Sequence, residues 1–379
     1  MGEGMRSVGV EEELLLVDAT SGVPLALSGH VLEAADRSAG QRPKDDWERG
    51  HTFERELAKE QVEFATKPVT DMGDLAREIG RWRREAARHA EGVGAVVAAL
   101  GTSPLPVEPS LNTGRRYQWV AEQFGLTAQE QLTCGCHIHV SVESDEEGVA
   151  VLDRMRPWLA VLTALSANSP FWQGQDTGYG SYRSRVWNRL PSAGPVDLFG
   201  SADGYRRQVR AMVDSGVLHD EGMIWFDARL SAAYPTVEVR AADVCLDGST
   251  PVLLAALVRG LVETAARSWR AGEPPAPVST SLLRLAAWQA GRSGLEGFLL
   301  HPETMRQTSP EEAVDALYRH VREALLDHGD DALVSEGLEV LLREGNGARV
   351  QRELLRAGGD LAAVVTRCAE ITVETAATS

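Results

Sequence analysis

Apolar and polar residues alternate along several short segments of the chain, and such alternation is typical of β-strands that are buried on one face. The predicted strands cover residues 6–18, 60–66, 133–143, 224–230 and 235–242. Strands of this kind are common in antiparallel sheets that pack one face against helices. The pattern therefore predicts a sheet with one apolar face and one polar face.

Helical periodicity separates and follows the predicted strands. Thr70 or Asp71 is expected to cap an amphipathic helix that ends near residue 91, and a buried apolar run over 93–100 follows it. A second helix is predicted over 145–167, and from Pro251 onward the helical spacing dominates. Most strands thus precede most helices along the chain.

The length of the chain limits the number of domains. A chain of 379 residues exceeds the usual size of a single core, so it forms either two domains or one large domain of sheet and helices. Its content of 43% hydrophobic and 25% charged residues is ordinary for a soluble globular protein. We predict a single α+β domain over residues 1–379, with a sheet-rich part over 1–250 and a helical part over 251–379.

The charge of the chain restricts its partners. A formal net charge of −17 argues against nucleic-acid binding, because the protein would repel a phosphate backbone. A small anion such as ATP is still compatible, provided that metal ions and arginines neutralise its phosphates. The three lysines, Lys44, Lys59 and Lys67, lie outside any glycine-rich phosphate-binding loop. Arginine and metal are therefore expected to hold any nucleotide.

The N-terminal region and the cysteines indicate the compartment. The short apolar run from Leu14 to Val17 is neither a signal peptide nor a membrane span. Four cysteines are too few and too irregularly spaced for a disulfide framework, and they are Cys134, Cys136, Cys245 and Cys368. We expect a cytoplasmic protein with reduced thiols and no membrane partner.

The polar faces of the predicted strands carry an unusual set of side chains. Residues two apart in a strand share a face, and the pairs are Glu11 with Glu13, Gln61 with Glu63, His137 with His139, and Glu238 with Arg240. For any one strand, a solvated face is the ordinary interpretation. The four strands considered together differ from that ordinary case, because like charges on neighbouring strands destabilise a sheet unless a cation lies between them.

Several carboxylates with an imidazole form a hard, oxygen-rich site. Such a site suits Mg²⁺ or Mn²⁺ bridging to phosphates better than it suits zinc. Arg240 lies two residues from Glu238, so both side chains can face one transferring phosphoryl group, whose charge the arginine would neutralise. The strands therefore predict a cavity for a metal and a nucleotide, with Arg240 as a catalytic residue.

The segment Cys134-Gly-Cys136-His137-Ile-His139 also allows a zinc site, since thiolates and imidazoles are favoured zinc ligands. The Cys-x-Cys spacing is tighter than usual for zinc, and alternation places the two cysteines on one face and the two histidines on the other. The four side chains cannot easily share one ion, so zinc is the minor alternative.

Several stretches together resemble one known family. They are GVEEELLLVD near the start, EQVEFAT, CGCHIHVSV, the segment SANSPFW to PSAGP, PTVEVRAADVC, and LRLAAWQAGRSGLEGFLLHP. In kind and order they resemble the bacterial carboxylate–amine ligases known as type-2 glutamate–cysteine ligases, over nearly the whole chain. The resemblance implies a glutamine-synthetase-like catalytic fold, in which an antiparallel sheet flanked by helices carries ATP and two or three divalent ions on its polar face.

Classical glutamate–cysteine ligases are more distantly similar and imply the roles of individual residues. By this analogy Arg240 contacts the transferring phosphate, and six residues hold metal ions, namely Glu11, Glu13, Glu56, Glu63, His137 and Glu238. The distant relatives prefer aspartate at the position of Glu56. They have a different residue at the position of His139, which we assign to substrate binding.

The implied reaction joins a carboxylate to an amine at the expense of ATP, through an acyl phosphate. Arg183 and Arg185, within SYRSRVW, are candidates for binding the substrate carboxylate, because the guanidinium group matches a carboxylate with two hydrogen bonds. The sequence leaves open the acid, the amine and the general base. The alternatives are a guanidino kinase of the same broad fold and a non-catalytic protein that binds nucleotide or metal. A homodimer is expected only because symmetric pairs are the commonest assembly.

Overall fold

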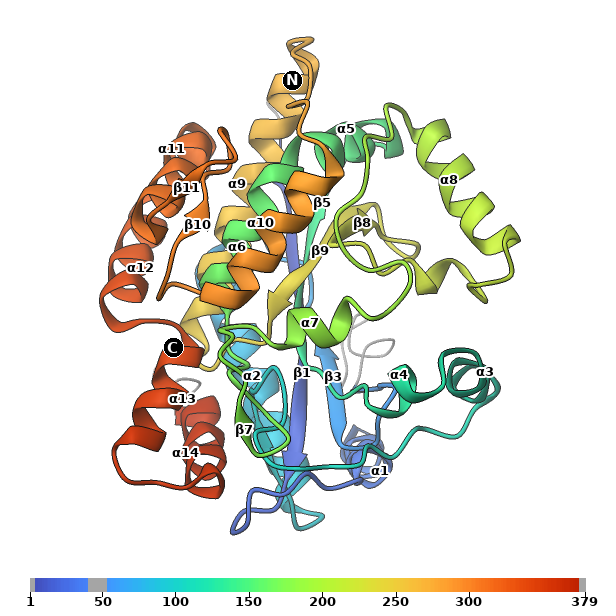
Figure 1. The fold of residues 1–379 in the computed structure, drawn as a ribbon, viewed down its shortest axis with the longest axis vertical. Coiled ribbons are helices and arrows are strands. Elements are labelled where there is room, and N and C mark those ends of the chain that lie inside the picture. Colours follow the sequence, from blue (N-terminus) through green and yellow to red (C-terminus); the bar gives the residue numbers. More distant parts are fainter. Residues whose placement is uncertain (1–3, 40–52, 375–379) are drawn as a thin grey trace.

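A computed structural model describes residues 4–39 and 53–374 of the chain. Its main feature is an antiparallel sheet in the strand order β2-β3-β1-β5-β9-β8, with β4 also paired to β1. Figure 1 labels β1, β3, β5, β8 and β9 of this sheet. The strands are β1 (Val8–Val17), β2 (Glu54–Arg55), β3 (Gln61–Ala65), β4 (Val96–Ala98), β5 (Gly135–Ser141), β8 (Ala228–Leu230) and β9 (Thr236–Asp243).

Strand β1 lies at the centre of this sheet. It pairs with β3 on one edge, and on the other edge with β5 over its first half and β4 over its last residues. Val8 and Val10 are buried in the main hydrophobic core, together with Ile138 and Val140 of β5. The apolar face that alternation predicts is therefore present and packed.

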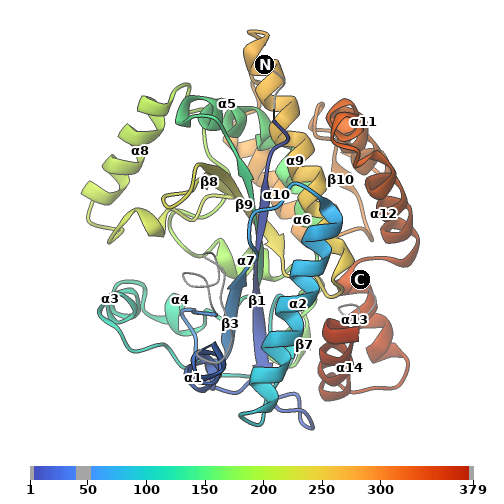
Figure 2. The same cartoon turned by 180° about the vertical axis from the view of Figure 1, so that it is seen from behind.

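Four helices, α2 (Met72–Glu91), α5 (Asp145–Met155), α6 (Leu159–Ser166) and α9 (Ser249–Arg270), contact the strands of the sheet and contribute to this core. Figure 2 shows α2 running alongside β1. Asp71 caps α2 by accepting a hydrogen bond from the backbone N–H of Asp74, as the sequence predicts. The antiparallel sheet and the helices packed on it confirm the predicted α+β class.

The helix predicted over 145–167 is interrupted. It consists of α5, a 3₁₀ turn over Arg156–Trp158, and α6. Pro157 lies inside this turn and has no N–H to donate to the preceding helical turn, which explains the break.

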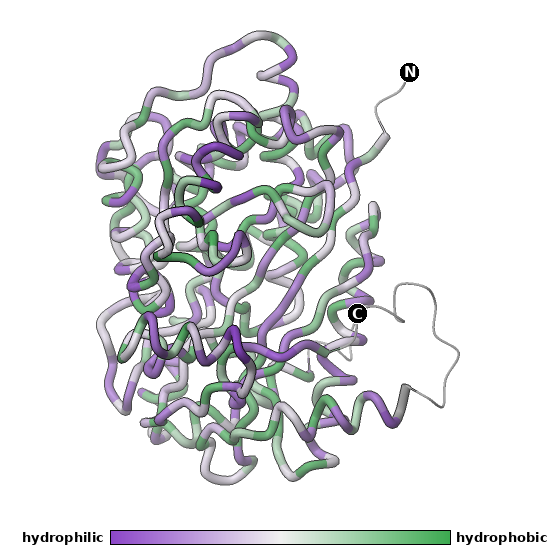
Figure 3. The backbone as a smooth tube through the Cα atoms, turned by 90° about the vertical axis from the view of Figure 1, so that its right-hand side faces the viewer, coloured by the Kyte–Doolittle hydropathy of each residue, from purple (hydrophilic) through white to green (hydrophobic). Residues whose placement is uncertain are grey.

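Helix α9 is long and apolar enough to cross a membrane, but 89% of its apolar window is buried inside the protein. Leu254, Leu257 and Val258 are completely buried in the main core. It is therefore a central core helix. Figure 3 shows that apolar and polar stretches are interleaved through the molecule.

The last third of the described chain is mostly helical. Helices α11 (Pro310–His328) and α12 (Asp331–Glu344) pack on α9, and α14 (Leu361–Glu374) packs beside β4. The other elements are α1 (Ser28–Ala39), α3 (Arg115–Phe124), α4 (Leu126–Gln129), β6 (Phe171–Trp172), β7 (Gln175–Asp176), α7 (Arg183–Trp187), α8 (Ala202–Asp214), a 3₁₀ turn over Glu221–Met223, α10 (Thr280–Ser293), β10 (Leu299–Leu300), β11 (Gln307–Thr308) and α13 (Gly347–Arg356).

Candidate active site

The register of the sheet sets the predicted polar residues side by side. Glu11 of β1 lies opposite His137 of β5, and Glu13 lies opposite Glu63 of β3. His139 lies opposite Glu238 of β9. Residues directly opposite one another in an antiparallel pair have neighbouring side chains. Four strands therefore contribute to one polar surface.

Three overlapping groups of side chains on this surface have the geometry to hold cations. They are Glu11 with Glu63 and His137; Glu11 with His139 and Glu238; and Glu13 with Glu56 and Glu63. Within each group, one ligand atom from each residue lies within 4.8 Å of the others. All six residues predicted as metal ligands are brought together here, and His139, predicted to bind substrate, lies among them.

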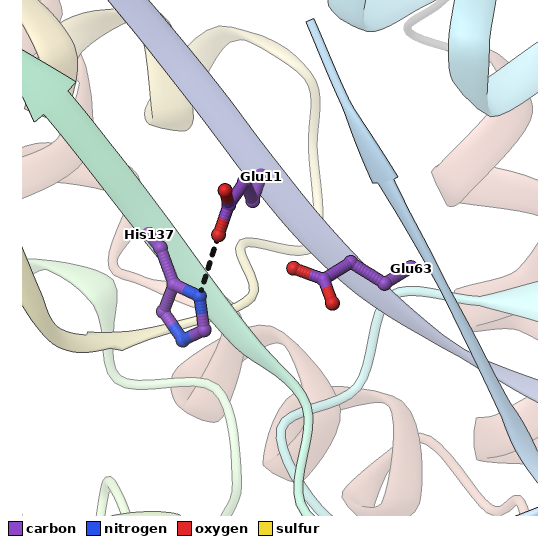
Figure 4. Close-up of side chains that lie close together, drawn as sticks. All are labelled: Glu11, Glu63 and His137. Atoms are coloured by element: carbon purple, nitrogen blue, oxygen red, sulfur yellow. Dashed lines mark hydrogen bonds and ion pairs between the residues drawn. The ribbon is translucent and has the colours of Figure 1, made fainter. Parts of the chain in front are cut away.

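The first group is visible in Figure 4. Nδ1 of His137 lies 3.2 Å from Oε2 of Glu11, and Glu63 points toward them from β3. Burial and the nearby Arg240 lower the pKa of His137 to about 4, so the ring is neutral. When Nδ1 donates to Glu11, Nε2 keeps a lone pair. Nε2 is buried and accepts no hydrogen bond from a described residue, as is expected of an imidazole prepared to bind a metal.

The carboxylates near β3 repel one another. Burial and the charge of Glu56 raise the pKa of Glu13 to about 8. Burial and the charges of Glu56 and Glu11 raise the pKa of Glu63 well above its usual value, and Glu63 has no ion pair with any described residue. A bound divalent cation would remove this repulsion. The donor set thus fits Mg²⁺ or Mn²⁺.

The opposite end of the surface is already neutralised by protein groups. Glu238 forms ion pairs with Arg240 and, at 2.8 Å, with Arg229. Although burial opposes it, these two arginines lower the pKa of Glu238 to about 2. The guanidinium of Arg240 also lies 5.6 Å from the ring centre of Trp187. Arg240 therefore has a fixed position beside the carboxylates.

Two side chains have polar atoms close to the ring nitrogens of His139. Its Nε2 lies 3.1 Å from Oε1 of Glu11, and its Nδ1 lies 3.0 Å from Oγ1 of Thr236. Burial acts to lower the pKa of His139, but the charge of Glu11, its hydrogen bond to the ring and the charge of Glu238 together raise this pKa. His139 also lines a cavity of about 430 Å³ at this end of the sheet, whose other lining residues include Gly9, Glu11, Tyr234, Thr236 and Glu238.

The two arginines of α7 have different surroundings. Arg183 is 1% exposed; its Nη1 lies 3.9 Å from Oδ1 of Asp243, and its charge acts on Glu13. A Cβ atom at Gly135 would lie 2.3 Å from Nη2 of Arg183, so this close approach requires glycine. Arg185 is half-buried, lies near Asp227, and forms no ion pair with a described residue. Of the two, only Arg183 acts on a carboxylate of the metal-binding groups.

The cysteines are free and buried among apolar side chains. Burial raises the pKa of Cys134 and Cys136 well above the usual value, which keeps both as neutral thiols. Within the described part of the chain, no group able to hold a metal includes a cysteine. The structure therefore does not favour the zinc alternative.

The sequence interpretation missed three features near the site. Arg229 of β8 lies opposite Glu238 of β9. Alternation within the predicted strand over 224–230 could have identified it as a residue of the polar face. Asp243 is completely buried and accepts hydrogen bonds from the segment that carries Arg183, but no local pattern marks it. Trp187 lies 5.4 Å from the guanidinium of Arg183, and the sequence offers no signal for that contact.

Comparisons with known proteins agree with the resemblance. The model of glutamate–cysteine ligase family 2 matches residues 7–367. A Streptomyces avermitilis protein with the provisional name glutamate–cysteine ligase 2-1 is 61% identical over 364 residues, covering 96% of this chain and 98% of the relative. A Streptomyces coelicolor protein, provisionally named glutamate–cysteine ligase 2, is also 61% identical, with the same coverage.

Two solved structures share the fold. The crystal structure of glutamate–cysteine ligase from Francisella tularensis in complex with AMP matches with a TM-score of 0.69 at 12% identity, covering 98% of this chain and 90% of that one. A bifunctional glutathione synthetase from Pasteurella multocida matches with a TM-score of 0.69 at 15% identity, covering 98% of this chain and 52% of that one. With the family match over residues 7–367, the resemblance is confirmed: this chain belongs to glutamate–cysteine ligase family 2.

Proposed function

We propose that the protein is an ATP-dependent carboxylate–amine ligase of the glutamate–cysteine ligase type, which forms an amide through an acyl phosphate. The observation that carries this proposal is the set of three overlapping carboxylate and imidazole groups beside a cavity of about 430 Å³. The family membership, the names of the relatives and the AMP bound by the Francisella neighbour support it.

Divalent cations, Mg²⁺ or Mn²⁺, would be held by Glu11, Glu13, Glu56, Glu63, His137 and Glu238. The raised pKa of Glu13 and Glu63, and the lone Nε2 of His137, are the features that fit such ions. When bound, the cations would neutralise the phosphate oxygens of ATP.

ATP is proposed to occupy the cavity at the end of β1, because this cavity reaches Glu11 and Glu238 at the edge of the carboxylate groups. A volume of about 430 Å³ lies within the usual range for small-molecule sites. His139 and Tyr234 line it, so we now assign His139 to the nucleotide side of the site.

Arg240 is proposed to contact the phosphoryl group as it transfers, because its guanidinium lies between Glu238 and His137 and is held by Trp187. Arg183, buried beside Glu13, is the proposed contact for the carboxylate of the acid substrate. The carboxylate attacks the γ-phosphorus of ATP, and ADP leaves. The amine nitrogen then attacks the acyl carbon, and phosphate leaves.

The comparisons do not favour the guanidino kinase alternative, since the relatives carry ligase names. We propose a cytoplasmic location from the four free thiols. A homodimer remains a prediction, as does the assignment of residues 1–379 to one domain.

The deciding experiment measures ADP release by the purified protein with ATP and Mg²⁺. Glutamate alone, glutamate with cysteine, and panels of other acids and amines are compared, and products are identified by mass spectrometry. Release that requires an acid and an amine, with an amide as product, supports the ligase. A stable phosphorylated product without amide would instead support a kinase.

A further inference from the structure

Asp227 carries a carboxylate that belongs to none of the three metal-binding groups. It precedes β8, and the backbone N–H of Arg240 donates a 2.8 Å hydrogen bond to its carbonyl oxygen, so the two residues lie directly across from each other. Phe226 and Ala228, on either side of Asp227, are buried in the main core. The alternation therefore turns Asp227 toward the polar face that carries Arg240.

Helix α7 contributes two charged groups that act on Asp227. Arg185 and then Arg183 act on the carboxylate of Asp227. Trp187 of the same helix lies against the guanidinium groups of both Arg183 and Arg240. Asp227 is thus placed under α7, one strand beyond Glu238, at the side of the polar surface away from β1 and β3.

The carboxylate of Asp227 forms no hydrogen bond and no ion pair with any residue that the structure describes. Other carboxylates near the site differ: Glu238 is paired with two arginines, and Asp243 accepts three hydrogen bonds. A half-buried carboxylate without such a partner is costly to keep. Burial raises the pKa of Asp227 to about 6, although Arg185 and Arg183 act to lower it. A group with this pKa can exchange protons near neutral pH.

We propose that Asp227 receives the amine substrate: its carboxylate binds the ammonium group and removes one proton from it. This inference rests on the proposed ligase function and adds the base that the sequence does not indicate. The position is suitable because the acyl phosphate would form at Arg240, directly across from Asp227. An amine that arrives at the Asp227 end of β8, whose other end lines the cavity assigned to ATP, reaches that carbonyl carbon without crossing the carboxylates of β1 and β3.

The proton balance of the step is complete. The ammonium group gives one proton to Asp227 and becomes a neutral amine. Its nitrogen forms the C–N bond as the bond between the acyl carbon and the phosphate oxygen breaks. The second proton leaves the nitrogen for the departing phosphate, and Asp227 returns its own proton to solvent.

The test compares two nucleophiles in wild type and Asp227→Asn, which preserves the size of the side chain. Hydroxylamine is mostly uncharged at neutral pH, so it can attack the acyl phosphate without losing a proton first. With ATP, Mg²⁺ and the acid identified for the wild type, we expect Asp227→Asn to keep hydroxamate formation within a few-fold. Its kcat/KM for the amine should fall by about 100-fold or more.

Asp214→Asn is the matched control, because Asp214 is exposed at the end of α8, and both activities should stay at wild-type values. Wild-type amide formation by Asp227→Asn would overturn the inference, as would equal loss of amide and hydroxamate in a variant with an unchanged melting temperature. If Asp227→Asn does not fold, Asp227→Ser provides the same comparison. If the wild type forms no hydroxamate with any acid, the proposed function itself fails, and this inference fails with it.

Discussion

Arg83 of α2 and Glu12 of β1 form a completely buried ion pair on the face of the sheet opposite the candidate active site. Nε and Nη2 of Arg83 donate hydrogen bonds of 2.8 and 2.7 Å to the two carboxylate oxygens of Glu12. Arg83 also donates to the carbonyl oxygens of Cys245 and Leu246, which follow β9. One arginine thereby ties α2 to the central strand and to the end of β9.

Removing this arginine should destabilise the fold. We expect Arg83→Leu to lower the free energy of unfolding by about 3–5 kcal/mol, because Glu12 would remain as an unpaired buried charge. The measurement is urea unfolding followed by circular dichroism. Arg367→Leu is the control, since Arg367 is an exposed partner of Glu374 and water screens that pair.

The double variant Arg83→Leu with Glu12→Leu should be more stable than Arg83→Leu alone, because no unpaired charge remains. It should not regain full stability, since two carbonyl groups lose their donor. A double variant less stable than the single one would contradict this account of the pair.

Glu63→Gln should weaken metal binding at the two ligand groups that contain it while leaving the protein folded. Glu63 belongs to two of the three ligand groups, and burial, together with the neighbouring Glu56, raises its pKa well above the usual value. We expect the metal-free variant to melt at the same temperature as the wild type or higher, because the amide cannot acquire the charge that burial and the neighbouring carboxylates disfavour at this position. Mg²⁺-dependent ADP release should be lost.

Thermal melting with and without Mg²⁺ measures both effects, and Glu91→Gln, at the exposed end of α2, is the control. If Glu63→Gln retains a wild-type increase in melting temperature on adding Mg²⁺, the assignment of Glu63 as a ligand is wrong.

The rate of amide formation should depend on the ionisation of Asp227. Burial raises the pKa of Asp227 to about 6, so its carboxylate becomes charged as the pH rises through 6. The groups that face it are Arg185, Arg183 and Arg240, and these stay positive over this range. We expect kcat/KM for the amine to rise through this pH in the wild type.

Asp227→Asn should lack that acidic limb of the pH profile. The measurement is the initial rate of amide formation by the wild type and by Asp227→Asn between about pH 5 and pH 8, the range over which such a group titrates. An unchanged acidic limb in Asp227→Asn would show that another group is responsible.

Asp243 should be required for the position of Arg183. Its carboxylate accepts hydrogen bonds from the backbone N–H of Asn168 and from the hydroxyls of Ser169 and Ser181. Asp243→Asn replaces one acceptor oxygen by a donor, so a buried donor loses its partner at a cost of about 1–3 kcal/mol. We expect a raised KM for the acid substrate, with a smaller effect on the KM for ATP.

Separate KM values for acid and ATP test this role, because general destabilisation would not affect one substrate alone. The paired variant Ser169→Ala with Ser181→Ala removes two of the same hydrogen bonds and should change the KM for the acid in the same direction. Equal changes in both KM values would refute a positioning role for Asp243.

The sequence predicted the strands of the site well because alternation is a local property. Glu11, Glu13, His137 and Glu238 follow from it directly, and the register then sets them side by side. Glu56 has no such signal, since it lies in irregular chain between β2 and β3, and only the family resemblance indicated it.

Long-range contacts could not be predicted in the same way. Glu12 and Arg83 are 71 residues apart, and nothing near either residue specifies the partner. The sequence also grouped Arg183 with Arg185, although their side chains have different surroundings. The backbone of a short helix such as α7 directs residues two apart to different sides, and the residues before it are hydrogen-bonded to the distant Asp243.

In strand β1, the position of each residue along the strand decides whether its side chain faces the candidate active site or the core. Because its side chains alternate, Glu11 and Glu13 face the site while Glu12 faces the core. Deleting a single residue early in β1 would exchange these roles, sending two carboxylates toward apolar helices and depriving Arg83 of its partner. This strand should therefore tolerate insertions and deletions far less than substitutions. In a library of single-residue deletions, active variants should be missing over Val8–Val17.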